Sequence, residues 1–163
     1  MAGRSGVSLN WGGLDRAIMN GARNLMNTKL LMETIGETLV SGTMKRFVEE
    51  KDPFGKPWKK SARAIEEAGQ TLSDTGRLRH SLNYAATQNK VVVGTNLKYA
   101  RIHQLGGEIK AKNGKSLKFK GRDGKDVFVK SVKIPARPYI GISAEDIKEV
   151  RETIRDFIAG AFD

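Results

Sequence analysis

The sequence lacks cysteine altogether and has only two histidines in 163 residues. Without thiols the chain cannot form a disulfide framework, a cysteine-ligated zinc finger or a cysteine nucleophile, which fits synthesis in a reducing cytoplasm. Long apolar runs are also missing, since no window approaches the roughly 20 residues of a membrane helix. The opening residues, MAGRSG, lack the apolar stretch of a secretory signal. We therefore expect a soluble chain that is not exported by the usual signal and makes no membrane contact.

Positive charge is what the sequence has in excess. It contains 29 Lys and Arg residues against 18 Asp and Glu, a formal net charge of +11. Such an excess concerns partners more than fold. Charge alone would suit nucleic acid, an acidic protein surface or an anionic membrane, and a basic amphipathic helix would be needed to favour the membrane. A length of 163 residues with 39% hydrophobic residues is typical of one compact domain, with room for an arm or a tail.

The strongest helical pattern runs from Thr28, which suits an N-cap, to about residue 50. Asp52 precedes Pro53 and ends the helix, because the residue before a proline avoids helical backbone angles. Apolar side chains at multiples of four form two adjacent rows, so we expect this helix to be the spine of the core. The rows are Leu31, Ile35, Leu39 and Phe47, and Met32, Val40, Met44 and Val48.

A second helix is predicted at the C-terminus. Ser143 is its expected cap, and Asp146 at the third helical position makes the start resemble a capping box. Its apolar face is formed by Ile147, Val150, Ile154, Phe157, Ile158 and Ala161.

The residues before Thr28 have a weaker helical pattern. A glycine-weakened helical pattern follows Leu9, so we expect 1–27 to be a helical segment that becomes ordered on assembly. Residues 28–163 are then a single domain.

Between the helices the sequence alternates irregular and strand-like stretches. Residues 52–76 are irregular, with Trp58 as their one large apolar anchor. A short helix starts near Thr75, strand patterns at 82–87 and 90–94 form a hairpin, and a second short helix carries Tyr99 and Ile102. The pattern as a whole predicts an α+β fold, with the two long helices packed on a small, mainly antiparallel sheet.

Residues 108–134 form the most basic segment, with nine Lys and Arg and three acids, a net charge of +6. Alternating apolar residues and a turn at 121–124 predict a long, projecting β-hairpin, and Phe119 and Phe128 are interpreted as its packing residues. We expect this arm to contact acidic partners or DNA. The candidate contact residues are Lys110, Lys112, Lys115, Lys118, Lys120, Arg122, Lys125, Lys130 and Lys133, together with Arg137 beyond the arm.

Arg137 lies between two prolines that enforce extended backbone. Two interpretations stay open for it. Its side chain either caps carbonyl groups or pairs with an acid in its own fold, or it reaches across a subunit boundary.

A search for chemistry finds no catalytic, cofactor-binding or metal site. His80 and His103 lack neighbouring ligands at the usual short spacings, so we expect a solvated His80 and a half-buried, hydrogen-bonded His103. Gly114-Lys115-Ser116 lacks the other glycine and the following helix of a phosphate-binding loop. We therefore expect a protein that is not an enzyme and carries no cofactor. Its expected structural anchors are Trp58, Leu31, Ile35, Leu39, Phe47, Tyr99, Ile102, Ile147, Val150 and Ile154.

Four segments together resemble the phage virion morphogenesis family, which includes tail-completion proteins of Mu-like and related tailed phages. They follow the helix that contains Phe47, and the resemblance covers about residues 28–158. In order they are DPFGKPW at 52–58, LSDTGRLRHSL at 72–82, VGTNLKYARIHQLGG at 93–107 and IPARP at 134–138. One departure is the stretch 61–63, where the family resemblance would lead us to expect threonines.

The resemblance implies a structural protein of the phage neck or tail end, which completes the tail and joins it to the head. It implies a homo-oligomeric ring, with a hexamer favoured, that contacts neck, tail-terminator or tail-tube proteins after assembly in the host cytoplasm. The residues alone leave an alternative, a basic nucleic-acid-binding module that uses the 108–134 hairpin.

Overall fold

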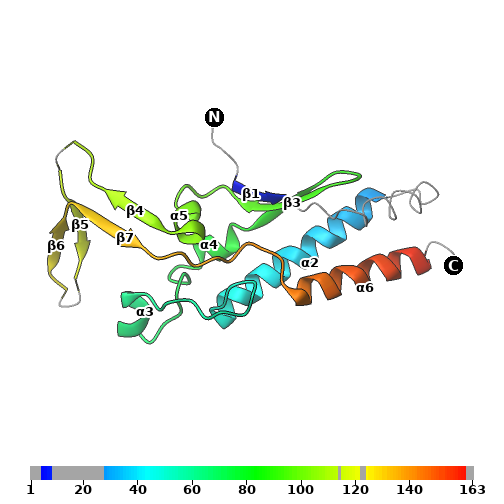
Figure 1. Cartoon of the computed structure of the whole chain (residues 1–163), viewed down its shortest axis with the longest axis horizontal. Helices are drawn as coiled ribbons and strands as arrows, with labels where there is room; N and C mark the ends of the chain where they lie inside the picture. The colour runs from blue at the N-terminus through cyan, green and yellow to red at the C-terminus, as the bar shows by residue number, and fades with distance from the viewer. Residues whose placement is uncertain (1–4, 9–27, 114, 122–123, 161–163) are drawn as a thin grey trace.

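The computed structural model describes residues 5–8, 28–113, 115–121 and 124–160 (Figure 1). Its helices are α2 (Thr28–Glu49), α3 (Ala62–Glu66), α4 (Arg77–His80), α5 (Ala100–Leu105) and α6 (Ala144–Gly160). Its strands are β1 (Ser5–Ser8), β2 (Asn83–Ala86), β3 (Val91–Thr95), β4 (Gly107–Lys110), β5 (Leu117–Lys120), β6 (Asp126–Val129) and β7 (Ser131–Ile134). The α+β prediction, with a long helix near each end of the domain, is confirmed.

The body is a sheet covered by the two long helices. Strand β3 is central in an antiparallel sheet of order β1-β3-β2, and Val93 is paired with Val7 on one side and Tyr84 on the other. Helix α2 packs on β2 and β3, and α6 runs alongside α2 (Figure 1). Sequence-distant elements therefore share one apolar layer.

Two apolar clusters fill the body. One joins the first half of α2 to β3 and α6 through residues that include Ile35, Val93 and Val150. The other surrounds Phe47. The centroid of its ring lies 5.5 Å from that of Trp58, with the two rings nearly perpendicular, and 5.1 Å from that of the tilted Tyr139 ring. The segment after α2 and the segment before α6 are thus fixed to the same end of the spine helix.

The two predicted rows of α2 have different fates. The row Leu31, Ile35, Leu39 and Phe47 is buried, with no side chain above 4% exposure. In the other row Val48 is 55% exposed, which corrects the expectation of a continuous second apolar row. Arg46 is buried instead, because the chain between Tyr139 and Asp146 closes over that part of the helix.

The remaining expected anchors lie at different depths. Trp58 and Val150 are 7% and 0% exposed, and Ile102 and Ile154 are partly buried. Tyr99, just before α5, and Ile147, in the first turn of α6, have 41% and 36% exposure, which corrects the expectation that they are buried anchors.

Helix α6 begins at the predicted cap. The backbone N–H of Asp146 donates to Ser143 Oγ at 3.0 Å, and the backbone N–H of Ser143 donates to Asp146 Oδ2 at 2.6 Å. This reciprocal pair confirms the capping box. The same carboxylate also pairs with the Arg46 guanidinium, so the cap ties α6 to α2.

Strand β1 was not predicted. Ser5–Ser8 pairs antiparallel with β3, although the segment SGVS has only one β-branched apolar residue and no strand pattern of its own. The exposed edge of the β2–β3 hairpin supplies the pairing that the local sequence does not specify. The helical prediction for the following residues, 9–27, lies outside the described residues.

The predicted basic hairpin is present as two ladders, one after the other along the arm. Strands β4 and β7 pair at its base and β5 and β6 pair at its tip, both antiparallel. In Figure 1 the arm leaves the body at the end of α5, and the β5–β6 ladder turns away from the line of β4 and β7. Gly106, with a φ of 70°, makes the departure possible, because a Cβ there would lie 2.7 Å from the backbone nitrogen of Ala136.

Candidate assembly surfaces

The arm presents its positive charge to solvent. The eight lysines predicted as contact residues are all exposed, and Arg122 lies outside the described residues. Lys110 pairs with Glu108 at 3.2 Å, while Lys118 and Lys120 share Asp126 at 2.8 and 3.0 Å. Within the described part of the arm, four lysines have no ion-pair partner. They are Lys112, Lys115, Lys130 and Lys133.

The two acids of the described arm are held ionised by their neighbours. Hydrogen bonds from Ser131 and Lys110 lower the pKa of Glu108, and those from Lys118 and Lys120 lower the pKa of Asp126. Protonation therefore removes little of the arm's internal pairing near neutral pH, and its net charge stays positive.

The tip of the arm also has an apolar face. Directly paired residues share a face of a two-stranded ladder, so Leu117 and Val129 lie beside Phe119 and Val127. Phe119 is 44% exposed, and Phe128 on the opposite face is 62% exposed with Lys118 Nζ 5.7 Å from its ring centroid. The interpretation of both phenylalanines as packing residues is corrected, because a projecting two-stranded ladder has no second layer to cover either face.

A groove between α2 and α6 forms a second, different surface. It has a volume of about 460 Å³ and is lined by the end of α2, the turn at 52–55 and the start of α6. Lys45 pairs with Glu145 at 2.8 Å across its edge, and the buried Arg46–Asp146 pair forms its floor. Glu49 and Glu149 lie beside these pairs. Of the remaining charges, three acids outnumber the single Lys51, so the groove is net negative by two.

The turn after α2 gives this groove an apolar edge. Asp52 Oδ1 accepts hydrogen bonds from the backbone N–H groups of Phe54 and Lys56 at 2.8 and 2.9 Å, and Gly55 has a φ of +82°. This tight turn holds Phe54 at 89% exposure. The DPFGKPW segment therefore both anchors Trp58 in the core and presents a phenylalanine to solvent.

The segment at 134–140 is locked to α5. Gln104 Oε1 accepts the backbone N–H groups of Tyr139 and Ile140 at 2.9 and 3.0 Å, and its Nε2 donates to the carbonyl of Ile140 at 2.8 Å. Trp58 Nε1 donates to the Pro138 carbonyl at 2.9 Å. Three of the segments noted in the sequence thus meet at one place in the fold.

Arg137 is only 6% exposed, and its Nε donates to the Lys59 carbonyl at 2.7 Å. Of the two open interpretations, carbonyl capping within the fold is what this contact shows. The guanidinium is recessed, and its contact with a partner stays a prediction. His103 lies next to it and is half-buried as expected, but among the described residues its Nδ1 has no hydrogen-bond partner. Burial and then the charge of Arg137 lower the pKa of His103.

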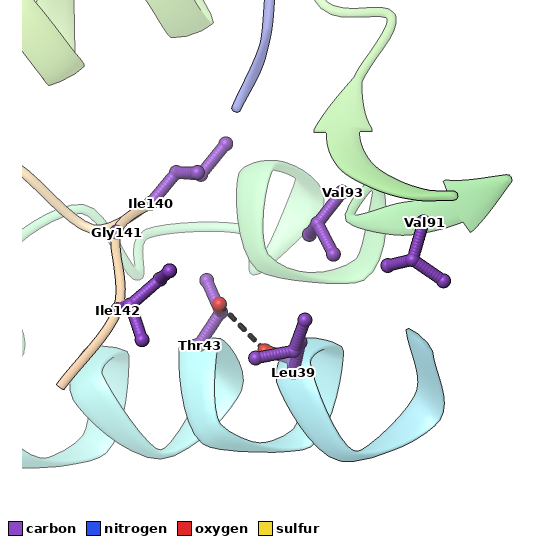
Figure 2. Close-up of a pocket in the computed structure, with 7 residues that line it drawn as sticks. All are labelled: Leu39, Thr43, Val91, Val93, Ile140, Gly141 and Ile142. Atoms are coloured by element: carbon purple, nitrogen blue, oxygen red, sulfur yellow. Dashed lines mark hydrogen bonds between the residues drawn. The ribbon is translucent and has the colours of Figure 1, made fainter. Parts of the chain in front are cut away.

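Sites for small ligands are limited in the described structure. The apolar pocket in Figure 2 lies between α2, β3 and the chain before α6, and its volume of about 10 Å³ holds one water molecule at most. The Thr43 hydroxyl in its wall already donates to the Leu39 carbonyl at 2.8 Å. The described residues bring together no group of three His, Asp or Glu that suits a metal ion. Across those residues, no helix combines the length and apolarity needed to cross a bilayer.

These features define an α+β body with a projecting basic arm and a groove of net negative charge. The chain belongs to the phage virion morphogenesis family, whose model matches residues 9–159. It is 34% identical over 128 residues to the Mu-like prophage FluMu G protein 2 of Haemophilus influenzae, covering 78% of this chain and 75% of that protein. No solved structure matches the chain. Membership gives the chain a structural role in the assembly of phage virions.

Proposed function

We propose that this protein acts at the neck or tail end of the virion, where it completes the tail and joins it to the head as a subunit of an oligomeric ring. It performs this role by binding and not by catalysis. Family membership supports an assembly role. The observation that supports a role as a ring subunit is the arm. It holds exposed lysines and the apolar face around Phe119 away from the body, where another molecule can cover them.

A closed ring of identical subunits needs two different, complementary patches on each subunit. The arm, with a net charge of +6, and the groove, net negative by two and edged by Phe54, satisfy this requirement in charge and in apolar character. In the proposed ring the arm of one subunit lies against the groove of the next. Six subunits are favoured, and neck, tail-terminator or tail-tube proteins cover the ring's outer faces.

The structure defines a clean test of the arm. Ala111 donates its backbone N–H to the Lys130 carbonyl at 2.9 Å, so these two residues can flank a two-residue hairpin turn. We replace residues 112–129 with Asn-Gly, which shortens the arm and leaves β4 and β7 paired. The expected product has native helical circular dichroism and stays monomeric in light scattering, alone and with candidate tail and connector proteins.

The corresponding variant on the groove side is Phe54→Ser. It leaves the eight exposed lysines of the arm and Arg122 unchanged. It should also weaken assembly while leaving the body folded. Wild-type assembly by the shortened chain would refute the proposed role of the arm. A wild-type chain that is monomeric in every mixture would refute the ring.

Contact of the arm with DNA is a second candidate, favoured by the four lysines without ion pairs in the described arm. If DNA is the main partner, the logarithm of the affinity should fall with the logarithm of salt concentration by about 0.9 for each phosphate neutralised. A gel-shift titration at two salt concentrations measures this slope. Absence of DNA binding at low salt would remove this candidate.

A further inference from the structure

Two arginines are buried in the described part of the chain, and they differ in compensation. Arg46 is 5% exposed and is paired with Asp146, and it also donates to the carbonyls of Tyr139 and Gly141. Arg137 is 6% exposed but makes no ion pair with any described residue. Within that part of the chain, its guanidinium has the Lys59 carbonyl as its hydrogen-bond acceptor.

A buried cation without an anion is unfavourable, because it has lost its hydration and has gained no counter-charge. Burial accordingly lowers the pKa of Arg137. Among the described residues, Arg46 is matched by a carboxylate, whereas Arg137 has no acidic partner.

Arg137 lines a cleft with a volume of about 330 Å³. Arg77 and Tyr99 lie on the same lining; Arg77 is exposed and Tyr99 is 41% exposed. His103, whose ring contacts that of Tyr99 edge-on at 6.0 Å, adds a buried Nδ1 that has no partner among the described residues. The lining does contain Asp74, but its carboxylate is 3.8 Å from Arg63 Nη1 and makes no ion pair with Arg137.

We propose that this cleft receives a carboxylate side chain from an adjoining protein subunit. The inference rests on the proposed assembly function and identifies a recognition site within it. A planar guanidinium binds a carboxylate through two parallel hydrogen bonds. A slender acidic side chain reaches a recessed arginine, whereas the phosphates of a duplex lie on a stiff surface and are met by exposed lysines and arginines such as those of the arm.

The test uses the full chain and a blocked tripeptide of three glutamates as the carboxylate probe. Because the chain has two histidines, their ring signals in a nuclear magnetic resonance titration are readily told apart. We expect the peptide to shift the His103 signals more than those of His80, which is exposed and outside the cleft lining.

Three variants assign the effect to the cleft. Arg137→Gln should weaken peptide binding about 10- to 100-fold, the effect of losing a hydrogen-bonded charge partner. Arg77→Gln should weaken it less, because this side chain lies at the exposed rim. Arg101→Gln removes the same charge from the exposed side of α5, outside the cleft lining, and should leave binding unchanged. If Arg137→Gln does not fold, the wild-type titration and the Arg77 variant decide the matter.

A short DNA duplex is titrated as the competing probe. If the duplex shifts the His103 signals and the peptide does not, the cleft binds phosphate and the proposal is wrong. It is equally wrong if neither probe shifts them, or if Arg101→Gln weakens binding as much as Arg77→Gln. Ring formation is followed separately by light scattering. A ring that forms while the cleft binds no peptide would refute this inference alone, whereas peptide binding by a persistent monomer would refute the ring.

Discussion

Replacing Asp146 by Asn tests the buried ion pair that joins the two long helices. The side chains of Arg46 and Asp146 are 7% and 3% exposed, so the substitution leaves a charged guanidinium in a site with little water. Asn keeps the size of Asp and retains an oxygen that can accept from the Ser143 N–H, so the change is mainly one of charge. Removing one partner of a buried pair costs about 3–5 kcal/mol.

The carbonyls of Tyr139 and Gly141, 3.1 and 3.2 Å from Arg46 Nη1, still accept from the guanidinium. We therefore expect Asp146→Asn to lower the free energy of unfolding by about 3 kcal/mol, the lower limit of that range. That is a large part of the roughly 5–15 kcal/mol that stabilises a typical domain.

The chain supplies a matched control one residue away on each helix. Lys45 and Glu145 join the same two helices with the same sequence separation, but their side chains are 51% and 59% exposed. Water and salt screen an exposed pair, so Glu145→Gln should change the free energy of unfolding far less than Asp146→Asn does.

Urea denaturation followed by circular dichroism measures both variants, provided that the dependence of unfolding free energy on urea concentration is unchanged. A double-mutant cycle with Arg46→Met and Lys45→Met gives the two coupling energies, and we expect the buried pair to have clearly the larger one. If Asp146→Asn costs no more than Glu145→Gln, the reasoning about the buried pair is refuted.

Three further predictions concern helix packing, pH and assembly. Gly36→Ala should destabilise the protein by about 1–2 kcal/mol in urea denaturation. The added Cβ would lie 2.3 Å from the Tyr84 ring, and this overpacking exceeds the gain in helix propensity of about 1 kcal/mol. Equal or greater stability would contradict this. Burial by itself would raise the pKa of Glu50, but hydrogen bonds from Lys60 and Thr71 outweigh it and lower the pKa. The stability that Glu50 contributes is therefore present above about pH 4.5 and is lost as the pH falls through the lowered pKa of Glu50. Glu50→Gln should then flatten the decline of the urea midpoint in that acidic range. If the urea midpoints of variant and wild type fall in parallel with pH, Glu50 does not make this contribution. The chain has no cysteine, so introduced cysteines can report contact between subunits. Under mild oxidation, a mixture of Lys118→Cys and Glu149→Cys proteins should form an intermolecular disulfide more readily than a mixture of Lys118→Cys and Glu152→Cys, because residue 152 lies on α6 outside the groove. Equal yields would count against arm–groove contact.

Local signals were enough to predict the elements whose residues act on near neighbours. The row from Leu31 to Phe47, the Ser143–Asp146 cap and the β2–β3 hairpin are all specified within a few turns or one tight connection. The basic arm was visible for a similar reason, because its charge is concentrated in one continuous segment.

Features that depend on distant partners were not predictable in this way. Arg46 is buried because a carboxylate 100 residues later reaches it, and no spacing within α2 signals this. Strand β1 takes its conformation from the edge of β3, and Val48 is 55% exposed although it continues an apolar row of α2. The groove combines residues from two stretches that are far apart in the sequence, so its negative charge is invisible in a sequence whose overall balance is positive.

The two proposed contacts should respond differently to salt. Arm lysines such as Lys112 and Lys130 are exposed, and charges on a surface are largely screened once the Debye length falls from about 10 Å at 0.1 M to about 3 Å at 1 M salt. Arg137 is recessed, and a carboxylate that reaches it is desolvated, so screening weakens that contact much less. Raising the salt concentration should therefore release the arm before the cleft. Arm–groove crosslinking in the disulfide assay should be lost at a salt concentration at which the peptide-dependent shift of His103 in the nuclear magnetic resonance titration persists. The reverse order would mean that the arm's apolar face, and not its charge, dominates its contact.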